Sequence, residues 1–236
     1  MRVPRDMRWA FWGGAYYEHE LAYWLERLMS DSRHPVFYDV GANYGYFSLL
    51  LAPLAESVHA FEPVTTTRAT LERNLADARL QHVVVHDVAL SDRGGWADIR
   101  LFSSSGNNSL FDVVVGKGVT QTGTQRVRLD TLDHQVYALG LPIPGLIKMD
   151  VEGGELQVLR GGSRLLHEHH PIIVLEFFEP HFHRAGYTSQ DVIHELASAG
   201  YELWAIPEDP DRRELRRLDD DLSLVSCVVA IELRDR

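Results

Sequence analysis

The sequence predicts an α/β protein with a doubly wound, mostly parallel sheet, and three observations support this prediction. Short apolar runs alternate along the chain with segments whose apolar residues recur at helical spacing. The run 172–178 is almost continuously apolar, as expected of a central parallel strand covered on both faces. The last two predicted strands are joined by a charged loop at 208–221, which favours an antiparallel strand at the edge of a seven-stranded sheet.

The first predicted element is an amphipathic helix over about residues 15–29, because Leu21, Leu25 and Leu28 recur at helical spacing. It belongs to an N-terminal segment, residues 1–34, that is rich in aromatic side chains. The remaining residues, 35–236, are expected to form one domain. The first half of this domain predicts helices that begin near 46 and 65, and strands at 35–38, 58–61, 82–87 and 96–101.

The segment 103–125 interrupts this alternation. It is rich in Ser, Gly, Asn and Thr around two short apolar patches. Loops of this length inside a compact domain are typically lids, binding loops or disordered segments. We therefore treat 103–125 as a candidate lid or substrate loop, with disorder as the open alternative.

The alternation resumes in the second half of the chain. Apolar runs predict strands at 146–149, 172–178, 201–206 and 222–233, and a helical pattern follows residue 155. Thr188 with Asp191 three residues later resembles a capping box, and Gly200 is a typical helix end.

Composition narrows the partners and the compartment. The 236 residues include 45% hydrophobic residues, which is sufficient for a full core, and the formal net charge of −11 offers no general attraction to nucleic acid or anionic lipid. The single cysteine, Cys227, excludes an intrachain disulfide and fits a reducing compartment. The apolar stretch 9–17 is too short for a signal or a membrane span. We expect a cytoplasmic protein without nucleic-acid or membrane partners, and homo-oligomerisation stays open.

The run from Asp39 to Gly45 indicates a nucleotide-cofactor site. Gly41 and Gly45 lie in a strand-to-helix turn, where glycine permits positive φ and lets the backbone approach a ligand closely. The next strand ends in Glu62, whose carboxylate is placed to accept hydrogen bonds from the ribose of a nucleoside. Two strand ends are thus expected to meet at one ligand.

The composition of the turn favours S-adenosylmethionine as that ligand. Dinucleotide sites usually carry G-x-G-x-x-G and present bare amides to a pyrophosphate, whereas Asp39 would repel a pyrophosphate and attract a cation. S-adenosylmethionine has a ribose, an ammonium and a sulfonium, and no phosphate. A glycine cluster without any ligand is the plainer alternative.

Four predicted strand ends carry acids, namely Asp39, Glu62, Asp87 and Asp150. In open α/β sheets, ligands bind beyond the carboxyl ends of the strands, where the strand order reverses. Asp39 and the backbone of Gly41 would face the methionine portion and Glu62 the ribose. Asp87, with the Val88 amide beside it, would meet the adenine, although Asp87 is equally explained as a plain turn residue.

Catalytic and metal-binding candidates cluster after the later strands. Asp150 or Glu152 would hold the cationic end of the cofactor or orient and deprotonate a substrate hydroxyl. His181 or His183 is a candidate general base, with an exposed loop histidine as the alternative. Asp150 and Glu176, with Glu179 or His181, could bind Mg²⁺ or another divalent ion, although strand-end carboxylates also occur without metal.

Taken together, the motifs resemble those of the FkbM-type methyltransferases. The resemblance covers roughly residues 35–206 and rests on five stretches in this order: 37–48, 61–63, 89–92, 147–155 and 159–162. It implies a Rossmann-like class I methyltransferase fold, S-adenosylmethionine as methyl donor, and O-methylation of a hydroxyl on a sugar, polyketide or other natural product. On this basis the cofactor residues are Asp39, Gly41, Asn43, Gly45 and Glu62, with Asp87 and Asp150. The full predicted set also includes their neighbours Ala42, Tyr46, Pro63 and Val88.

Two other functions compete with methyl transfer to a small-molecule or glycosylated acceptor. A cofactor-binding scaffold or sensor without catalysis has the same cofactor motifs. A nicotinamide-dependent dehydrogenase would need a turn that tolerates a pyrophosphate, and Asp39 argues against it.

Overall fold

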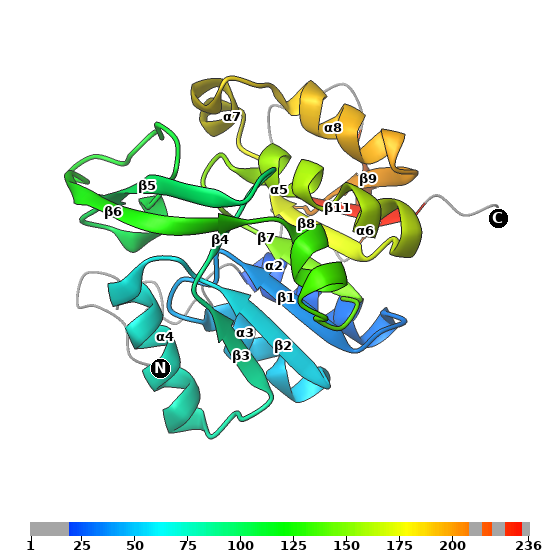
Figure 1. Ribbon diagram of the computed structural model, residues 1–236. Helices are drawn as coiled ribbons and strands as arrows, with labels where there is room; N and C mark the ends of the chain where they lie inside the picture. Colours follow the sequence, from blue (N-terminus) through cyan, green and yellow to red (C-terminus); the bar gives the residue numbers. More distant parts are fainter. Residues whose placement is uncertain (1–18, 208–213, 219–224, 233–236) are drawn as a thin grey trace.

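A computed structural model of the chain describes residues 19–207, 214–218 and 225–232. A large central sheet carries helices on both faces, and a small second sheet stands beside it (Figure 1). This arrangement confirms the predicted α/β class and the doubly wound, mostly parallel sheet. The aromatic residues of the N-terminal segment before residue 19 lie outside the described residues.

The central sheet contains eight strands in the described part of the chain. Their spatial order is β10 (Arg216–Arg217), β9 (Tyr201–Ala205), β11 (Cys227–Glu232), β8 (Ile172–Glu176), β7 (Leu146–Met149), β1 (Val36–Val40), β2 (Ser57–Phe61) and β3 (Val83–His86). The strands from β3 through β2, β1 and β7 to β8 pair in parallel. This parallel block is the framework on which the site is built.

The last strand runs antiparallel as expected, but its place in the sheet differs from the prediction. β11 lies between β8 and β9 and pairs antiparallel with both, and the short β10 forms the edge. Val228, Val229 and Ala230 are fully buried there. An interior position removes more of this apolar run from water than an edge would, which is why β11 inserts between its two neighbours.

Helices cover the two faces of the sheet (Figure 1). One face carries α2 (His19–Asp31), α3 (Tyr46–Leu51) and α4 (Thr65–Ala78), and the other carries α5 (Glu155–Gly161), α6 (Ser163–His169), α7 (Glu179–Ala185) and α8 (Ser189–Ser198). All five residues of β1 are buried, with Phe37 packed in one core and Tyr38 in the other. Both halves of the predicted capping box at Thr188 and Asp191 are present. None of the described helices has the length and hydropathy needed to cross a membrane.

The second sheet has the strand order β4-β6-β5, with β4 (Ala89–Leu90), β5 (Gly95–Phe102) and β6 (Gln121–Asp130). Ile99, Val127 and Leu129 pack against Val64 at the start of α4. The last five residues of the segment 103–125 belong to β6, so the connection between β5 and β6 is limited to residues 103–120. We call these residues the covering loop; they include the short 3-10 helix η3 (Ser105–Asn107).

The strand order reverses next to β1. β2 lies on one side of β1 and β7 on the other, both in parallel, while the chain between β3 and β7 builds the second sheet. The carboxyl ends of β1 and β7 therefore form the switch point at which ligands bind in folds of this kind.

Two short helical turns lie outside these strands: η2 (Ala52–Leu54) follows α3, and η4 (His134–Ala138) precedes β7.

Candidate functional site

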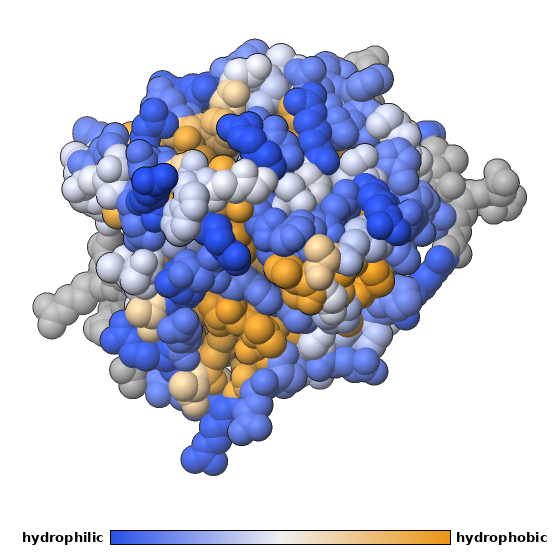
Figure 2. All heavy atoms as spheres, viewed as in Figure 1, coloured by the Kyte–Doolittle hydropathy of each residue, from blue (hydrophilic) through white to orange (hydrophobic). Residues whose placement is uncertain are grey.

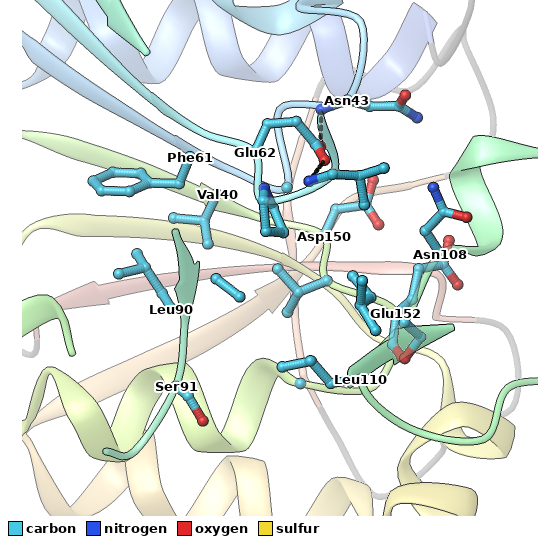
Figure 3. A pocket seen from close by; sticks show the side chains of 18 of the residues that line it. Val40, Asn43, Phe61, Glu62, Leu90, Ser91, Asn108, Leu110, Asp150 and Glu152 are labelled. Atoms are coloured by element: carbon cyan, nitrogen blue, oxygen red, sulfur yellow. Dashed lines mark hydrogen bonds between the residues drawn. The ribbon is translucent and has the colours of Figure 1, made fainter. Parts of the chain in front are cut away.

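A pocket opens at this switch point. Its walls come from the turn after β1, the residues after β2, the segment through β4, the covering loop and the turn after β7. Figure 3 shows Phe61, Val40 and Leu90 at one end of the pocket, and Asn108 and Glu152 at the other. The pocket thus has an apolar end and a polar end.

Two glycines of the turn after β1 have positive φ and leave little room for a side chain. Gly41 has φ 77°, and a Cβ there would lie 1.9 Å from the backbone oxygen of Asp150. Gly45 has φ 87°, and its Cβ would lie 2.3 Å from Leu71 Cδ1. The amides of Gly41 and Ala42 both donate to the Phe61 carbonyl at 3.1 Å. These contacts hold the turn against the ends of β2 and β7 and leave its outer side to the pocket.

Glu62 is the buried acid of the pocket wall. Only 6% of the residue is exposed, and its two carboxylate oxygens accept hydrogen bonds from the backbone amides of Asn43 at 3.0 Å and Val64 at 2.8 Å (Figure 3). Burial raises the pKa of Glu62 to about 7, against the lowering effect of these amides. A carboxylate has lone pairs beyond these two bonds, so Glu62 can accept from hydroxyl donors in the pocket as well.

Asp39 lies beneath the turn and not in the wall of the pocket. It is fully buried, accepts a 2.6 Å hydrogen bond from the Ser48 hydroxyl, and lies 3.8 Å from the ammonium of the buried Lys148. Burial raises the pKa of Asp39, and Lys148 and Ser48 oppose this rise. The same ammonium lies 3.2 Å from Asp150 Oδ2. Asp150, which lines the pocket, is therefore the acid at the place predicted for Asp39.

Lys148 is a residue of the site that was not among the predicted site residues. A lysine inside an apolar strand was the available signal, because buried lysines are rare unless they are paired with a carboxylate. Its position on β7, opposite Asp39 in register, brings the ammonium between Asp39 and Asp150. Lys148 thereby neutralises part of the acidic charge beneath the pocket.

The covering loop is bonded to both walls of the pocket. The Ser105 hydroxyl donates to Asn43 Oδ1 at 2.9 Å, and the Ser109 hydroxyl donates to the Glu152 carbonyl at 2.6 Å. The loop lines the pocket with residues that the sequence analysis did not single out, including Gly106, Leu110 and Phe111. The loop thus closes one side of the pocket.

Two further contacts join the covering loop to α7. Arg184 pairs with Asp112 at 2.9 Å, and His181 Nε2 lies 3.2 Å from the Val114 carbonyl. A carbonyl can only accept, so Nε2 carries the proton of the neutral imidazole and Nδ1 presents a lone pair. Val114 therefore determines which ring nitrogen of the buried His181 faces inward.

The turn after β7 is shaped by Glu155. This fully buried carboxylate accepts from the amides of Val151 at 3.0 Å and Gly153 at 3.1 Å, and from the Tyr187 hydroxyl at 3.3 Å. Glu152, between the two amides, has φ 54°. Because a non-glycine residue rarely adopts this conformation, the Glu155 network is what holds Glu152 in its orientation.

Glu152, Glu176 and His181 come together behind the pocket. His181 Nδ1 lies 3.2 Å from Glu152 Oε2 and 3.9 Å from Glu176 Oε2. Burial, and next the charges of Asp150 and Glu176, raise the pKa of Glu152 to about 10. Burial lowers the pKa of His181. This group joins three elements, since Glu152 follows β7, Glu176 ends β8 and His181 belongs to α7.

The structure brings only part of the predicted cofactor set into the pocket. The lining includes Gly41, Asn43, Glu62, Pro63, Val88 and Asp150, and also Glu152 from the predicted catalytic set. Ala42, Gly45 and Tyr46 lie in the turn and at the start of α3, outside the lining. Asp87 does not line the pocket, because its side chain is 67% exposed and pairs with Arg68. The cofactor roles of these residues stay predictions.

The predicted metal set, Asp150 and Glu176 with Glu179 or His181, is brought together only in part: His181 Nδ1 lies 3.9 Å from Glu176 Oε2. Glu179 turns away at the start of α7, where it accepts from the Ser189 amide at 2.8 Å and pairs with His183 at 3.0 Å. His183 is correspondingly exposed, with 63% of its side chain accessible, and it does not line the pocket, so its role as a base stays a prediction. Asp150 is engaged by Lys148.

A second cavity of about 260 Å³ adjoins the pocket. Asp150 lines both, and the remaining walls include Glu20 and Leu21 of α2, Glu176 at the end of β8, and Cys227 of β11. Asp150 therefore lies on the wall shared by the two cavities.

The fold and the site define a Rossmann-like α/β protein of the methyltransferase type. The chain belongs to the methyltransferase FkbM domain family, whose model matches residues 39–203. This match confirms the resemblance to FkbM-type methyltransferases that the sequence motifs indicated. The protein is a methyltransferase.

Curated relatives and solved structures agree with this assignment. Methyltransferase sdnD of Sordaria araneosa is 31% identical, over 62% of this chain and 68% of its own length. Hexuronic acid methyltransferase AglP of Haloferax volcanii is 29% identical, over 83% and 75%. 2-O-methyltransferase NoeI of Sinorhizobium fredii is 30% identical, over 56% and 59%.

Two crystal structures share the fold. The methyltransferase FkbM from Methylobacillus flagellatus superposes with a TM-score of 0.52 and 21% identity, covering 85% of this chain and 44% of that chain. A Streptococcus mutans protein in complex with SAH superposes with a TM-score of 0.51 and 10% identity, covering 89% and 97%.

Proposed function

We propose that this methyltransferase transfers the methyl group of S-adenosylmethionine to a hydroxyl of a small-molecule or glycosylated acceptor. The observation that carries the proposal is Glu62, a buried carboxylate held by two backbone amides in the wall of the pocket at the switch point. The SAH complex of the Streptococcus mutans protein supports an adenosyl ligand in this fold.

The described residues fit S-adenosylmethionine. The missing Cβ of Gly41 lets the turn approach β7, Glu62 accepts hydrogen bonds from ribose hydroxyls, and the apolar Phe61 and Leu90 suit the adenine. Asp150 lies at the same pocket and favours the cationic methionine end. When bound, S-adenosylmethionine supplies an electrophilic methyl group on a sulfonium. S-adenosylmethionine can contact all of these residues without a pyrophosphate.

Asp150 is also the proposed base for the acceptor. It lies on the wall shared with the second cavity, which we assign to the acceptor, and Glu152 and His181, which lie behind that wall, complete the proposed catalytic group. Alignment of the reacting atoms supplies most of the acceleration in such a displacement, and base assistance adds about 10²-fold or more.

Oxygen on a sugar or a natural product is the favoured target. AglP is named for a hexuronic acid and NoeI for a 2-O-methyl transfer, which supports a sugar-like hydroxyl acceptor for this chain. The net charge of −11 disfavours nucleic acid. A cytoplasmic location stays a prediction that rests on the single cysteine.

The test is calorimetric titration of the purified full-length protein with S-adenosylmethionine, S-adenosylhomocysteine and NAD, followed by methyl-transfer assays on a panel of hydroxylated sugars and polyketides. We expect micromolar binding of both adenosyl ligands and no binding of NAD. Binding of NAD alone would overturn the proposal. Adenosyl binding with no transfer to any hydroxyl would support the scaffold alternative instead.

A further inference from the structure

Three metal-ligating side chains converge between the two cavities. The ligand atoms of Glu152, Glu176 and His181 all lie within 4.8 Å of one another. His181 is 4% exposed, and the side chains of Glu152 and Glu176 are 15% and 33% exposed. Glu152 lines the first cavity and Glu176 the second. The group is therefore buried and still reachable from both cavities.

Two atoms of this group make no hydrogen bond to the described residues. They are Glu152 Oε2 and His181 Nδ1, and both are buried. Buried polar atoms are nearly always satisfied, because an unsatisfied one loses its hydration without compensation. Here the two atoms face each other at 3.2 Å, so a single species between them and Glu176 would satisfy both.

The orientation of the imidazole matches that of a metal ligand. A histidine that binds a metal through one nitrogen usually donates its other N–H to a carbonyl or carboxylate, which fixes the ring and the tautomer. His181 Nε2 lies 3.2 Å from the Val114 carbonyl, so the lone pair of Nδ1 faces the two carboxylates. The covering loop supplies this outer contact.

Charge and distance also favour a cation. Glu155 and Asp150 lie near Glu152, and the ammonium of Lys148 is already placed between Asp39 and Asp150. Ligands about 2.0 to 2.2 Å from one ion lie roughly 3.0 to 3.5 Å apart at octahedral or tetrahedral angles. The two histidine–carboxylate separations, 3.2 and 3.9 Å, need only a small closure, and the two carboxylates lie within 4.8 Å of each other.

We propose that Glu152, Glu176 and His181 Nδ1 bind one divalent transition-metal ion of the Mn²⁺, Co²⁺ or Zn²⁺ class. The imidazole nitrogen favours these ions over Mg²⁺ and Ca²⁺, which prefer oxygen ligands. Three protein ligands leave positions open for a ligand from the adjoining cavities.

The role of the ion rests on the proposed function. An acceptor hydroxyl beside the ion becomes more acidic. Its O–H bond breaks with the proton passing to the Asp150 carboxylate, and its oxygen forms a bond to the methyl carbon. The C–S bond breaks with its electron pair left on sulfur, which yields S-adenosylhomocysteine.

The test uses Mn²⁺ as the probe. The full-length protein is treated with EDTA, dialysed and titrated with Mn²⁺, and free Mn²⁺ is followed by its electron paramagnetic resonance signal. We expect one equivalent to bind, with affinity reduced at least about tenfold in His181→Ala and in Glu176→Gln. The matched control is His183→Ala, since His183 is on the same helix and pairs with Glu179 outside the cluster; its affinity should match the wild type.

Two further measurements check that a loss of Mn²⁺ binding is not caused by unfolding or by a failure of the proposed function. Circular dichroism shows whether the variant of the buried His181 is folded, and Glu176→Gln, which keeps the side-chain size at a partly exposed position, serves if it is not. Titration of the metal-free protein with S-adenosylmethionine separates the two proposals. The metal site is rejected if the wild type shows no saturable Mn²⁺ binding, or if neither variant weakens Mn²⁺ binding. The proposed function stands in either case, provided that the metal-free protein binds S-adenosylmethionine.

Discussion

The Ser109 hydroxyl donates a 2.6 Å hydrogen bond to the backbone carbonyl of Glu152, across 43 positions of sequence. Ser109 is 1% exposed, and it also accepts from the Phe111 amide at 2.9 Å. This one side chain joins the covering loop to the turn that carries Glu152. The closure of the pocket and the orientation of the acid are therefore coupled.

Ser109→Ala removes both hydrogen bonds and leaves the Glu152 carbonyl and the Phe111 amide without this partner. We expect the free energy of unfolding to fall by about 1–3 kcal/mol and KM for the methyl acceptor to rise. Urea unfolding and steady-state kinetics measure the two effects. Ser103→Ala is the control, because this exposed residue of the same loop accepts a 3.2 Å bond from the Thr120 amide, and its effect should stay below about 0.5 kcal/mol. Equal stabilities of the two variants would contradict the coupling.

Binding of S-adenosylmethionine is expected to depend on pH through Glu62. Its pKa of about 7 in the free protein is above the ordinary value, mainly because of burial. The stability that this group contributes is fully present below its unfolded pKa, near 4.5, and is lost as pH rises through about 7. Ribose hydroxyls donate better to the charged carboxylate, so ligand binding has the opposite trend and improves as pH rises towards 7 and above.

Calorimetric Kd values between pH 5.5 and 8.5 check this trend. We expect affinity to fall by up to about tenfold per pH unit below 7 and to level off above it. Glu62→Gln should bind more weakly and remove the pH dependence, while Glu56→Gln, an exposed site just before β2, should retain both affinity and trend. A pH profile that persists in Glu62→Gln would assign it to another group, with Glu155 the next candidate since its pKa is also raised to about 7.

Gly41→Ala tests the close approach of the turn to β7. The added Cβ would lie 1.9 Å from the Asp150 backbone oxygen, at a positive φ that alanine disfavours. We expect a loss of about 2–5 kcal/mol in the free energy of unfolding, from strain and overpacking together. The control is Gly123→Ala in β6, where a Cβ meets nothing within 4 Å. Similar melting temperatures for both variants would reject the steric role of Gly41.

Asp150→Asn keeps the side-chain shape and removes its charge. We expect kcat to fall by about 10²-fold, with native circular dichroism and saturable acceptor binding, because the proposed base is lost while the walls of both cavities remain. Glu179→Gln is the control, since Glu179 contacts Ser189 and His183 outside the pocket. Full turnover in Asp150→Asn would exclude both the catalytic and the cofactor-orienting role of this residue.

Much of the fold was predictable because its signals are local. The apolar run of β8 and the capping box of α8 follow from side-chain periodicity and neighbouring residues alone. The position of β11 was not predictable in this way. Antiparallel insertion between β8 and β9 depends on which neighbours bury Val228 to Ala230, and these neighbours are distant in sequence.

The residues of the candidate site were likewise predictable only where the signal is local in sequence. Gly41 and Glu62 were identified from a strand, a turn and the end of the next strand, and both line the pocket. Asp39 was expected to face the ligand, but it lies beneath the turn, where it pairs with Lys148 on the neighbouring strand β7. The partners of Asp39 come from β7, which the local pattern around residue 39 does not contain.

The doubly wound class, the glycine turn, the acid after β2 and the family were all readable from the sequence, since each rests on patterns that are complete within short stretches of chain. The group of Glu152, Glu176 and His181 and the closure of the pocket by Ser105 and Ser109 become visible only in the folded chain. These contacts join β7, β8, α7 and the covering loop. Their geometry depends on strand register and helix packing, which are collective properties of the whole core rather than of any one segment.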